Sequence, residues 1–235
     1  MKKISVIIPA YNEEENLPKI ISSLRNQVNK NFEIIIIDNN SSDKTFEIAK
    51  GLADKVFICK TQGFVFARNL GARKSKNEIV AFLDADSIPP KNWTEVISYN
   101  FEKNKSLDAV SCVGVYDNKG FFGWFFANSF TWIVFGICKI STWIGNSQLI
   151  ANNLAIKRDL FLKVGGFDNF VVEDYYLSKK LNALGNVKTR MDSKMRVVYS
   201  ARRLEKEGLL KMILFWTSSI FKKKSLDKYK SHDEL

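Results

Sequence analysis

The first 110 residues alternate short apolar runs with segments of helical periodicity, and this alternation constrains the fold more than any other feature. The apolar runs predict strands, and the periodic segments predict amphipathic helices. Expected strands are residues 4–8, 34–37, 56–59, 79–83 and 109–115, and expected helices are residues 17–28, 64–75, 91–104 and a helix from 44. Such alternation predicts an α/β fold with a mostly parallel sheet and helices on both faces.

Similar signals return after residue 150. We expect strands at 153–156 and 195–199 and helices at 158–164 and 174–184. The Gly-Gly-Phe-Asp sequence at 165–168 is typical of a turn. These elements extend the first part of the chain into one large domain.

Charge indicates the class of partner. The formal net charge is +11 with a pI near 9.5, which implies an anionic partner. The excess gathers at residues 202–230, which hold nine Lys or Arg against three acids around an apolar segment. This pattern favours an anionic membrane surface over nucleic acid. The three cysteines have no disulfide or metal spacing, which is typical of a reduced, cytosolic setting.

Two apolar segments differ from the globular pattern. Residues 120–138 carry no charge and are rich in Phe and Trp. We expect the wider segment 121–145 to lie in a membrane interface or to form an acceptor groove. A buried helix pair and a true membrane span are the alternatives. Residues 209–221 predict a basic amphipathic interfacial helix within the tail 204–235, or alternatively a terminal helix packed on the core.

Two carboxylates follow the apolar run at 79–83. Along an extended chain, Asp84 and Asp86 would point the same way at the carboxyl end of a strand, where open α/β sheets bind ligands. Two oxygen ligands with no His or Cys nearby suit Mg²⁺ or Mn²⁺ carrying a phosphorylated substrate.

Five sequence blocks together resemble the family 2 glycosyltransferases of the GT-A fold, over roughly residues 4–203. The blocks are SVIIPAYNEE at 5–14, DNNSSD at 38–43, ARNLG at 67–71, FLDAD at 82–86, and GGFD at 165–168 with ED at 173–174. Their order and spacing match the family. Asn39 and Asn40 depart from it, because the family more often has Asp-Gly there.

The resemblance implies a role for each motif residue. The expected nucleotide-sugar contacts are Pro9, Ala10, Tyr11, Glu13, Asp38, Arg68, Asp84 and Arg203. The expected metal ligands are Asp86 and, beside it, Asp84; the expected general base is Asp174, with Glu173 and Gly166 on the acceptor side.

The residue chemistry fits these roles, and each also has a structural alternative. Asp38 ends a buried strand and can accept a nucleobase N–H, or else cap a helix. Arg68 suits a diphosphate or a base, or is an ordinary surface charge. Glu173 and Asp174 begin a helix, which favours ionised carboxylates, but they could be a capping pair alone. Arg203 could instead anchor the tail to anionic lipid.

The resemblance implies an inverting, metal-dependent transfer of a sugar from a UDP- or GDP-linked donor to a lipid-linked or cell-envelope glycan acceptor. We expect residues 1–203 to form one catalytic domain, with donor half 1–110 and acceptor half 111–203. The expected location is the cytoplasmic face of the membrane, bound peripherally.

Three alternatives remain from the sequence. The acceptor could be a polyprenyl phosphate, as in enzymes of the dolichol-phosphate-sugar synthase type. The chain could be a non-catalytic membrane scaffold on the same fold. Asp84 and Asp86 also match the nucleophile and acid of haloacid-dehalogenase-type phosphatases, although that class does not explain the blocks at 5–14 and 38–43.

Overall fold

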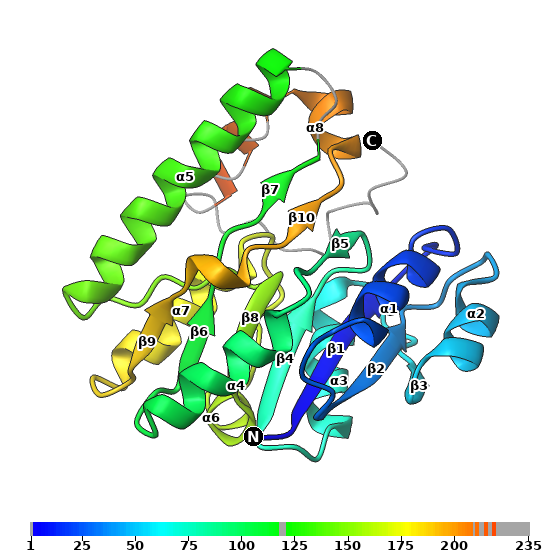
Figure 1. Ribbon diagram of the computed structural model, residues 1–235, viewed down its shortest axis with the longest axis horizontal. Helices are drawn as coiled ribbons and strands as arrows, with labels where there is room; N and C mark the ends of the chain where they lie inside the picture. The colour runs from blue at the N-terminus through cyan, green and yellow to red at the C-terminus, as the bar shows by residue number, and fades with distance from the viewer. Residues whose placement is uncertain (1, 118–120, 209, 212–213, 216–217, 220–235) are drawn as a thin grey trace.

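A seven-stranded sheet forms the centre of the protein (Figure 1). The structure is a computed structural model that describes residues 2–117, 121–208, 210–211, 214–215 and 218–219. The strand order is β3-β2-β1-β4-β8-β6-β9. The strands are β1 (Ile4–Ala10), β2 (Phe32–Asp38), β3 (Lys55–Ile58), β4 (Ile79–Leu83), β6 (Ala109–Ser111), β8 (Asn153–Lys157) and β9 (Thr189–Met191).

Most neighbouring strands run parallel, as the sequence predicts. Strands β3, β2, β1 and β4 are parallel neighbours, with Ala10 of β1 level with Asp38 of β2. Only β8 is reversed, lying antiparallel to both β4 and β6. Because the central parallel strands β1 and β4 are covered on both faces, their residues are almost all apolar and buried.

Helices cover both faces of the sheet, which confirms the expected layers. Helices α1 (Leu17–Arg25) and α4 (Trp93–Lys103) contribute to the apolar core on one face. Helices α3 (Phe64–Lys74), α6 (Arg158–Lys163) and α7 (Glu173–Ala183) contribute to the core on the other. Helix α2 (Thr45–Leu52) lies near the β3 edge. Helix α3 packs closely on β1, since a Cβ on Gly71 would lie 2.4 Å from Cγ2 of Ile7.

A second, three-stranded sheet lies beyond the carboxyl end of β4 (Figure 1). It contains β5 (Ser87–Ile88), β10 (Val198–Tyr199) and β7 (Val115–Tyr116). The expected strand at 195–199 was therefore too long, because a 3-10 helix, Ser193–Met195, precedes β10. The expected strand at 109–115 is split between β6 and β7. Strand β9 was not expected, since Thr-Arg-Met carries no apolar run.

The aromatic segment forms one long helix, α5 (Phe121–Trp143), which contacts β7 and β9. It is not the buried helix pair considered as an alternative, since several large apolar side chains are exposed. Among the residues that the structure describes, no helix is long and apolar enough to cross a membrane. Helix α8 (Arg202–Glu207) follows β10, and the expected helix at 209–221 falls largely outside the described residues.

Candidate functional site

The segments that follow β1 and β2 are joined by hydrogen bonds at the carboxyl edge of the sheet. The backbone N–H groups of Asn12 and Glu13 donate to Ser41 Oγ at 3.0 Å and Thr45 Oγ1 at 2.8 Å. Of the expected donor contacts, Pro9 and Ala10 end β1, while Tyr11 and Glu13 lie in the first loop. The Glu13 side chain accepts from Asn16 at 2.6 Å, so it helps to begin α1.

Asp38 is buried at the end of β2, with 3% of its surface exposed. Its Oδ2 accepts the Ser41 N–H at 3.3 Å. Its Oδ1 is buried and has no hydrogen-bond partner among the residues described. Since buried acceptors are nearly always paired, this oxygen is well suited to a donor from a bound ligand.

Asn39 and Asn40 replace the family's frequent Asp-Gly without disturbing the turn. The Asn39 amide donates to the carbonyls of Cys59 and Thr61 at 3.1 and 2.8 Å and accepts from the Gly63 N–H at 2.7 Å. It therefore holds the loop before α3. Asn40 has φ +64°, a conformation that glycine and asparagine tolerate best.

Asp84 and Asp86 lie in a turn rather than in a strand. Strand β4 ends at Leu83, and the Ser87 N–H donates to the Asp84 carbonyl at 3.1 Å. The expected alternation along an extended chain therefore does not apply to this pair. Both side chains are half-buried at the carboxyl end of β4, which keeps them at the ligand-binding edge of the sheet.

Arg68 of α3 connects the two halves of the site. Its Nη2 lies 2.5 Å from Asp84 Oδ1, and its Nη1 lies 2.6 Å from Glu173 Oε1. The guanidinium is also 4.9 Å from the Phe64 ring centroid and 5.7 Å from that of Phe167. Arg68 is 3% exposed, so the two carboxylates are the compensation that a buried cation needs.

The burial of Arg68 rules out the surface-charge alternative. Two of its nitrogens bind carboxylates, and its contact with a diphosphate or a base stays a prediction. Sequence reasoning missed the two ion pairs because the partners lie 16 and 105 residues away. Arg68 positions Asp84 and Glu173 relative to each other.

Asn69, next to Arg68, holds the Gly-Gly-Phe-Asp turn. Its side chain donates to the Phe167 carbonyl at 2.8 Å and accepts the Phe167 N–H at 2.9 Å. Gly166 has φ +68°, and a Cβ there would lie 2.4 Å from Asn69 Oδ1. Gly166 is therefore a packing residue beside the site. The role of Asn69 in this turn was not predicted, and the only indication of it in the sequence was that Asn69 belongs to the ARNLG block.

Glu173 and Asp174 open α7 on the acceptor side. Burial raises the pKa of Glu173 to about 8, although the Arg68 charge opposes this. Burial also raises the pKa of Asp174, while a hydrogen bond from the Tyr175 N–H, at 2.8 Å from Asp174 Oδ1, lowers it. A carboxylate with a raised pKa is a stronger base than an exposed aspartate.

Tyr199 of β10 was not expected at the site. Its hydroxyl donates to Asn152 Oδ1 at 2.8 Å. Burial, and next the negative charge of Asp84, raise the pKa of Tyr199 well above its ordinary value. The second sheet thus brings a neutral phenol close to the Asp84 carboxylate. A two-residue strand gives no sequence signal for this. Arg203 lies in α8, and its side chain is outside what the structure describes.

The donor set fits a hard divalent cation. The turn offers the carboxylate oxygens of Asp84 and Asp86, and Mg²⁺ is commonly held by one or two carboxylates plus substrate phosphates. Within the described ranges, no three His, Cys, Asp or Glu side chains are grouped as a complete metal site. Asp86 and Asp84 would therefore hold an ion together with a phosphorylated ligand.

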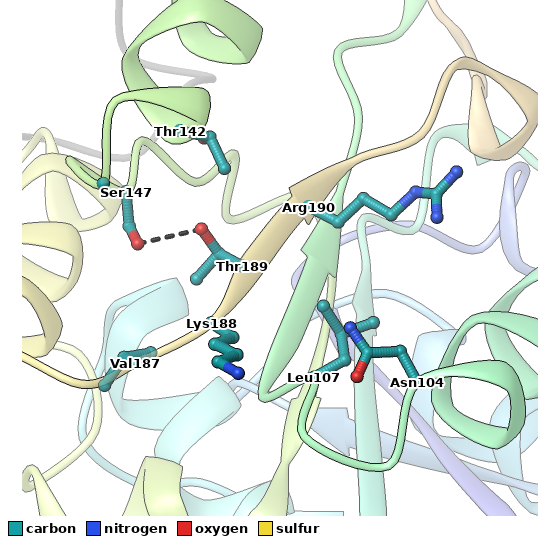
Figure 2. A pocket seen from close by; sticks show the side chains of 9 residues that line it. Asn104, Leu107, Thr142, Ser147, Val187, Lys188, Thr189 and Arg190 are labelled. Atoms are coloured by element: carbon teal, nitrogen blue, oxygen red, sulfur yellow. Dashed lines mark hydrogen bonds between the residues drawn. The ribbon is translucent and has the colours of Figure 1, made fainter.

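A cavity of about 340 Å³ lies at the β9 edge of the sheet (Figure 2). Lys188, Thr189 and Arg190 line it on β9 and the residue before it, and Ser147 Oγ lies 2.8 Å from Thr189 Oγ1. None of the residues expected at the site lines this cavity. The candidate site is therefore the carboxylate-rich sheet edge.

Comparison with known proteins identifies the family. The model of the family described as glycosyl transferase family 2 matches residues 5–165. An uncharacterised glycosyltransferase of Haemophilus influenzae is 30% identical over 76% of this chain and 61% of its own length. The glucosyl-dolichyl phosphate glucuronosyltransferase of Haloferax volcanii is 28% identical over 71% of this chain and 56% of its own. This chain thus spans about three fifths of these relatives.

The solved structures agree on the fold. The mannosyltransferase PcManGT from Pyrobaculum calidifontis, in complex with GDP-Man and Mn²⁺, superposes with a TM-score of 0.63 at 19% identity. The match covers 84% of this chain and 56% of that protein. With the matching motifs, sheet order and carboxylate-lined edge, these findings show that the chain belongs to glycosyl transferase family 2.

Proposed function

We propose that the chain is an inverting glycosyltransferase that moves a sugar from a UDP- or GDP-linked donor to a lipid-linked or cell-envelope glycan acceptor. We further propose that it works at the cytoplasmic membrane face as a peripheral protein. The observation that carries the proposal is the Arg68 bridge, which joins Asp84 at the donor edge to Glu173 beside Asp174. The donor and acceptor groups thus meet at one place.

The donor end is organised for a nucleotide. The unpaired Oδ1 of Asp38 can accept an N–H of uracil or guanine at the end of β2. A divalent ion, Mg²⁺ or Mn²⁺, held by Asp86 with Asp84 would neutralise the leaving diphosphate. The PcManGT complex contains both GDP-Man and Mn²⁺, which supports this class of donor and ion.

The acceptor end is organised for proton removal. Asp174 takes the proton of an acceptor hydroxyl as that oxygen attacks the anomeric carbon in line with the departing nucleotide. This displacement inverts the anomeric configuration. NMR of the product anomer checks the mechanism, and a product with the donor's configuration contradicts it.

A polyprenyl phosphate acceptor is the second candidate. The name of the Haloferax relative includes a glucose linked to dolichyl phosphate, which supports a polyprenyl-linked substrate, and helix α5 carries exposed apolar side chains that suit a lipid chain. A phosphate acceptor is already anionic, so proton removal by Asp174 would matter less. The effect of losing this carboxylate separates the two acceptors.

UDP or GDP is expected to stabilise the protein against heat when Mn²⁺ is present. A ligand at about 100 times its Kd adds about 2.7 kcal/mol, or a Tm rise of about 5–10 °C for a chain of this size. The Asp38→Ala variant should lose most of this shift. Asp159→Ala, whose side chain is 96% exposed, is the matched control. If no nucleotide shifts the wild-type Tm, the non-catalytic scaffold becomes the better interpretation.

Asp86→Asn is expected to remove the Mn²⁺ dependence of the nucleotide shift while leaving a smaller metal-free shift. Asn keeps the size of the side chain but removes the charge that holds a divalent cation. The measurement is a Mn²⁺ titration of Tm at fixed nucleotide. An unchanged metal dependence in Asp86→Asn would assign the ion to other groups.

The kcat/KM of the enzyme is expected to rise with pH, with its acidic limb at a higher pH than an exposed aspartate would give. Asp174 must be ionised to accept a proton, and burial raises its pKa from the model-compound value of 3.8. Activity is therefore lost as pH falls through this raised pKa. A pH profile from about 4 to 9 measures it. An acidic limb at the pH of an exposed aspartate would mean that the base is solvated.

A further inference from the structure

Helix α5 has two faces of different character. Its inner face is buried and includes Ala127, Thr131, Phe135 and Cys138. Its outer face carries Phe126, Ile133, Ile137, Ile140 and, just past its end, Ile144, which are 60–69% exposed. The intervals of seven, four, three and four residues place these five side chains along one stripe. We call this stripe the α5 outer face.

The α5 outer face has no partner among the described residues of the chain. Helix α5 lies along one side of the molecule and turns its inner face toward β7 and β9 (Figure 1). Trp132 and Trp143 lie to one side of the stripe and are 50% and 86% exposed, and Trp124, near the start of the helix, is 47% exposed. Exposed aliphatic side chains with several tryptophans are unusual for a surface in contact with water alone.

Basic residues lie on helix α5 and on the helix that packs against it. Lys139 is exposed and is the single charged residue of α5. Helix α8 packs on the amino-terminal part of α5 through Leu204 and Ala127, and Lys206 and Lys211 are exposed there. The sequence from 202 to 230 is basic overall. An exposed apolar stripe with cationic side chains on the same helix and on the helix beside it complements an anionic lipid bilayer.

We propose that the α5 outer face binds an anionic lipid bilayer, with the helix lying in the plane of the interface. This inference rests on the proposed function and names the surface through which the chain meets the membrane. Tryptophan side chains prefer the headgroup level, and the isoleucines lie in one row that can enter the acyl boundary. The chemistry that is recognised is an acidic phospholipid surface.

The inner face of the same helix carries a group that is affected by the charge of Asp174, the proposed general base. Cys138 lies on the inner face of α5, and its thiol pKa is raised to about 11, first by burial and then by the negative charge of Asp174. The inner face of α5 is thus within electrostatic reach of Asp174. An acceptor anchored in lipid would meet the site beside this helix.

Vesicle binding of a variant with carboxylates on the α5 outer face tests the proposal. Ile133→Glu/Ile137→Glu/Ile140→Glu places three carboxylates on the α5 outer face. Val28→Glu/Leu52→Glu/Leu184→Glu is the matched control, since these side chains are also exposed, at 63%, 38% and 40%, and lie on other surfaces. Both variants change the net charge by the same amount, so a difference between them reports the surface itself.

Binding is measured by flotation with phosphatidylcholine vesicles and with vesicles enriched in phosphatidylglycerol. We expect the wild type and the control to bind the acidic vesicles, and the α5 variant to bind about a hundredfold more weakly or worse. Equal binding by both variants would overturn the proposal. Loss of a dimer by light scattering in the α5 variant, without any vesicle binding by the wild type, would assign the face to a second copy.

Nucleotide stabilisation of the same samples separates this inference from the proposed function. If UDP or GDP with Mn²⁺ raises the Tm but the protein does not bind vesicles, the proposed donor chemistry stands and the proposed membrane surface is wrong. If the protein floats with vesicles but no nucleotide raises its Tm, the membrane surface stands and the proposed transferase function is wrong. The α5 variant should keep the nucleotide shift, because its substitutions lie on exposed positions away from the carboxylates.

Discussion

Asp174→Asn is expected to lower kcat by about 10²–10⁴-fold with a hydroxyl acceptor, because it removes the group that takes the acceptor proton. Asn has nearly the same shape and can still accept the Tyr175 N–H that now reaches Asp174 Oδ1. The fold of α7 should therefore persist. KM for the donor should change little, since the donor contacts lie on β2 and after β4. The measurement is steady-state transfer of sugar at saturating donor.

The size of this loss identifies the acceptor. A severe loss indicates a hydroxyl, whose proton must be removed, whereas a loss of only a few fold indicates a phosphate that is already anionic. Asp159→Asn is the control, because that carboxylate is exposed on α6. A loss as large in the control as in Asp174→Asn would remove Asp174 from the mechanism.

Arg68→Met is expected to destabilise the fold by about 3–5 kcal/mol, the usual cost of removing one partner from a buried ion pair. The change removes the cation that Asp84 and Glu173, which is 8% exposed, both contact, and the loss is largest at pH values where Glu173 is ionised. Methionine is of similar length and apolar, so the loss reports mainly the charge. Urea unfolding followed by circular dichroism measures the change in the free energy of unfolding.

Arg73→Met in the same helix is the matched control, because Arg73 is exposed. Its effect should stay within about 0.5 kcal/mol. Adding Asp84→Asn and Glu173→Gln to Arg68→Met should restore part of the stability, since no buried carboxylate is then left unpaired. If Arg68→Met and Arg73→Met lowered the free energy of unfolding by equally small amounts, the ion pairs of Arg68 with Asp84 and Glu173 would contribute little to folding.

The Arg68 variant should also be more sensitive to high pH than the wild type. The folded-state pKa of Glu173 is raised to about 8 from 4.5 even with Arg68 present. A carboxyl with a raised folded-state pKa favours folding at low pH, and its contribution is lost as pH rises toward that pKa. Without Arg68 the penalty for ionising Glu173 grows, so the difference between variant and wild type widens as pH rises.

Most of the sheet could be predicted because local patterns specify it. Continuous apolar runs such as residues 4–8 and 79–83 must be buried on both faces, and the intervening helices supply that cover. The motif blocks also predicted which carboxylates gather at the sheet edge. Short elements such as β9 and β10 were missed or misplaced, because two or three residues carry too little periodicity to indicate a strand.

The sequence by itself indicated the family, the layered sheet and which carboxylates lie at the carboxyl edge of that sheet. These features depend on motifs and on burial patterns that are local in the chain. Only the tertiary structure decided what Arg68, Asn69 and Tyr199 do, because each acts on residues that are distant in sequence. It also decided which side of α5 is buried, since the helix is apolar almost all round. The physical reason is the same in each case: a side chain's role depends on which charge or surface the fold places against it.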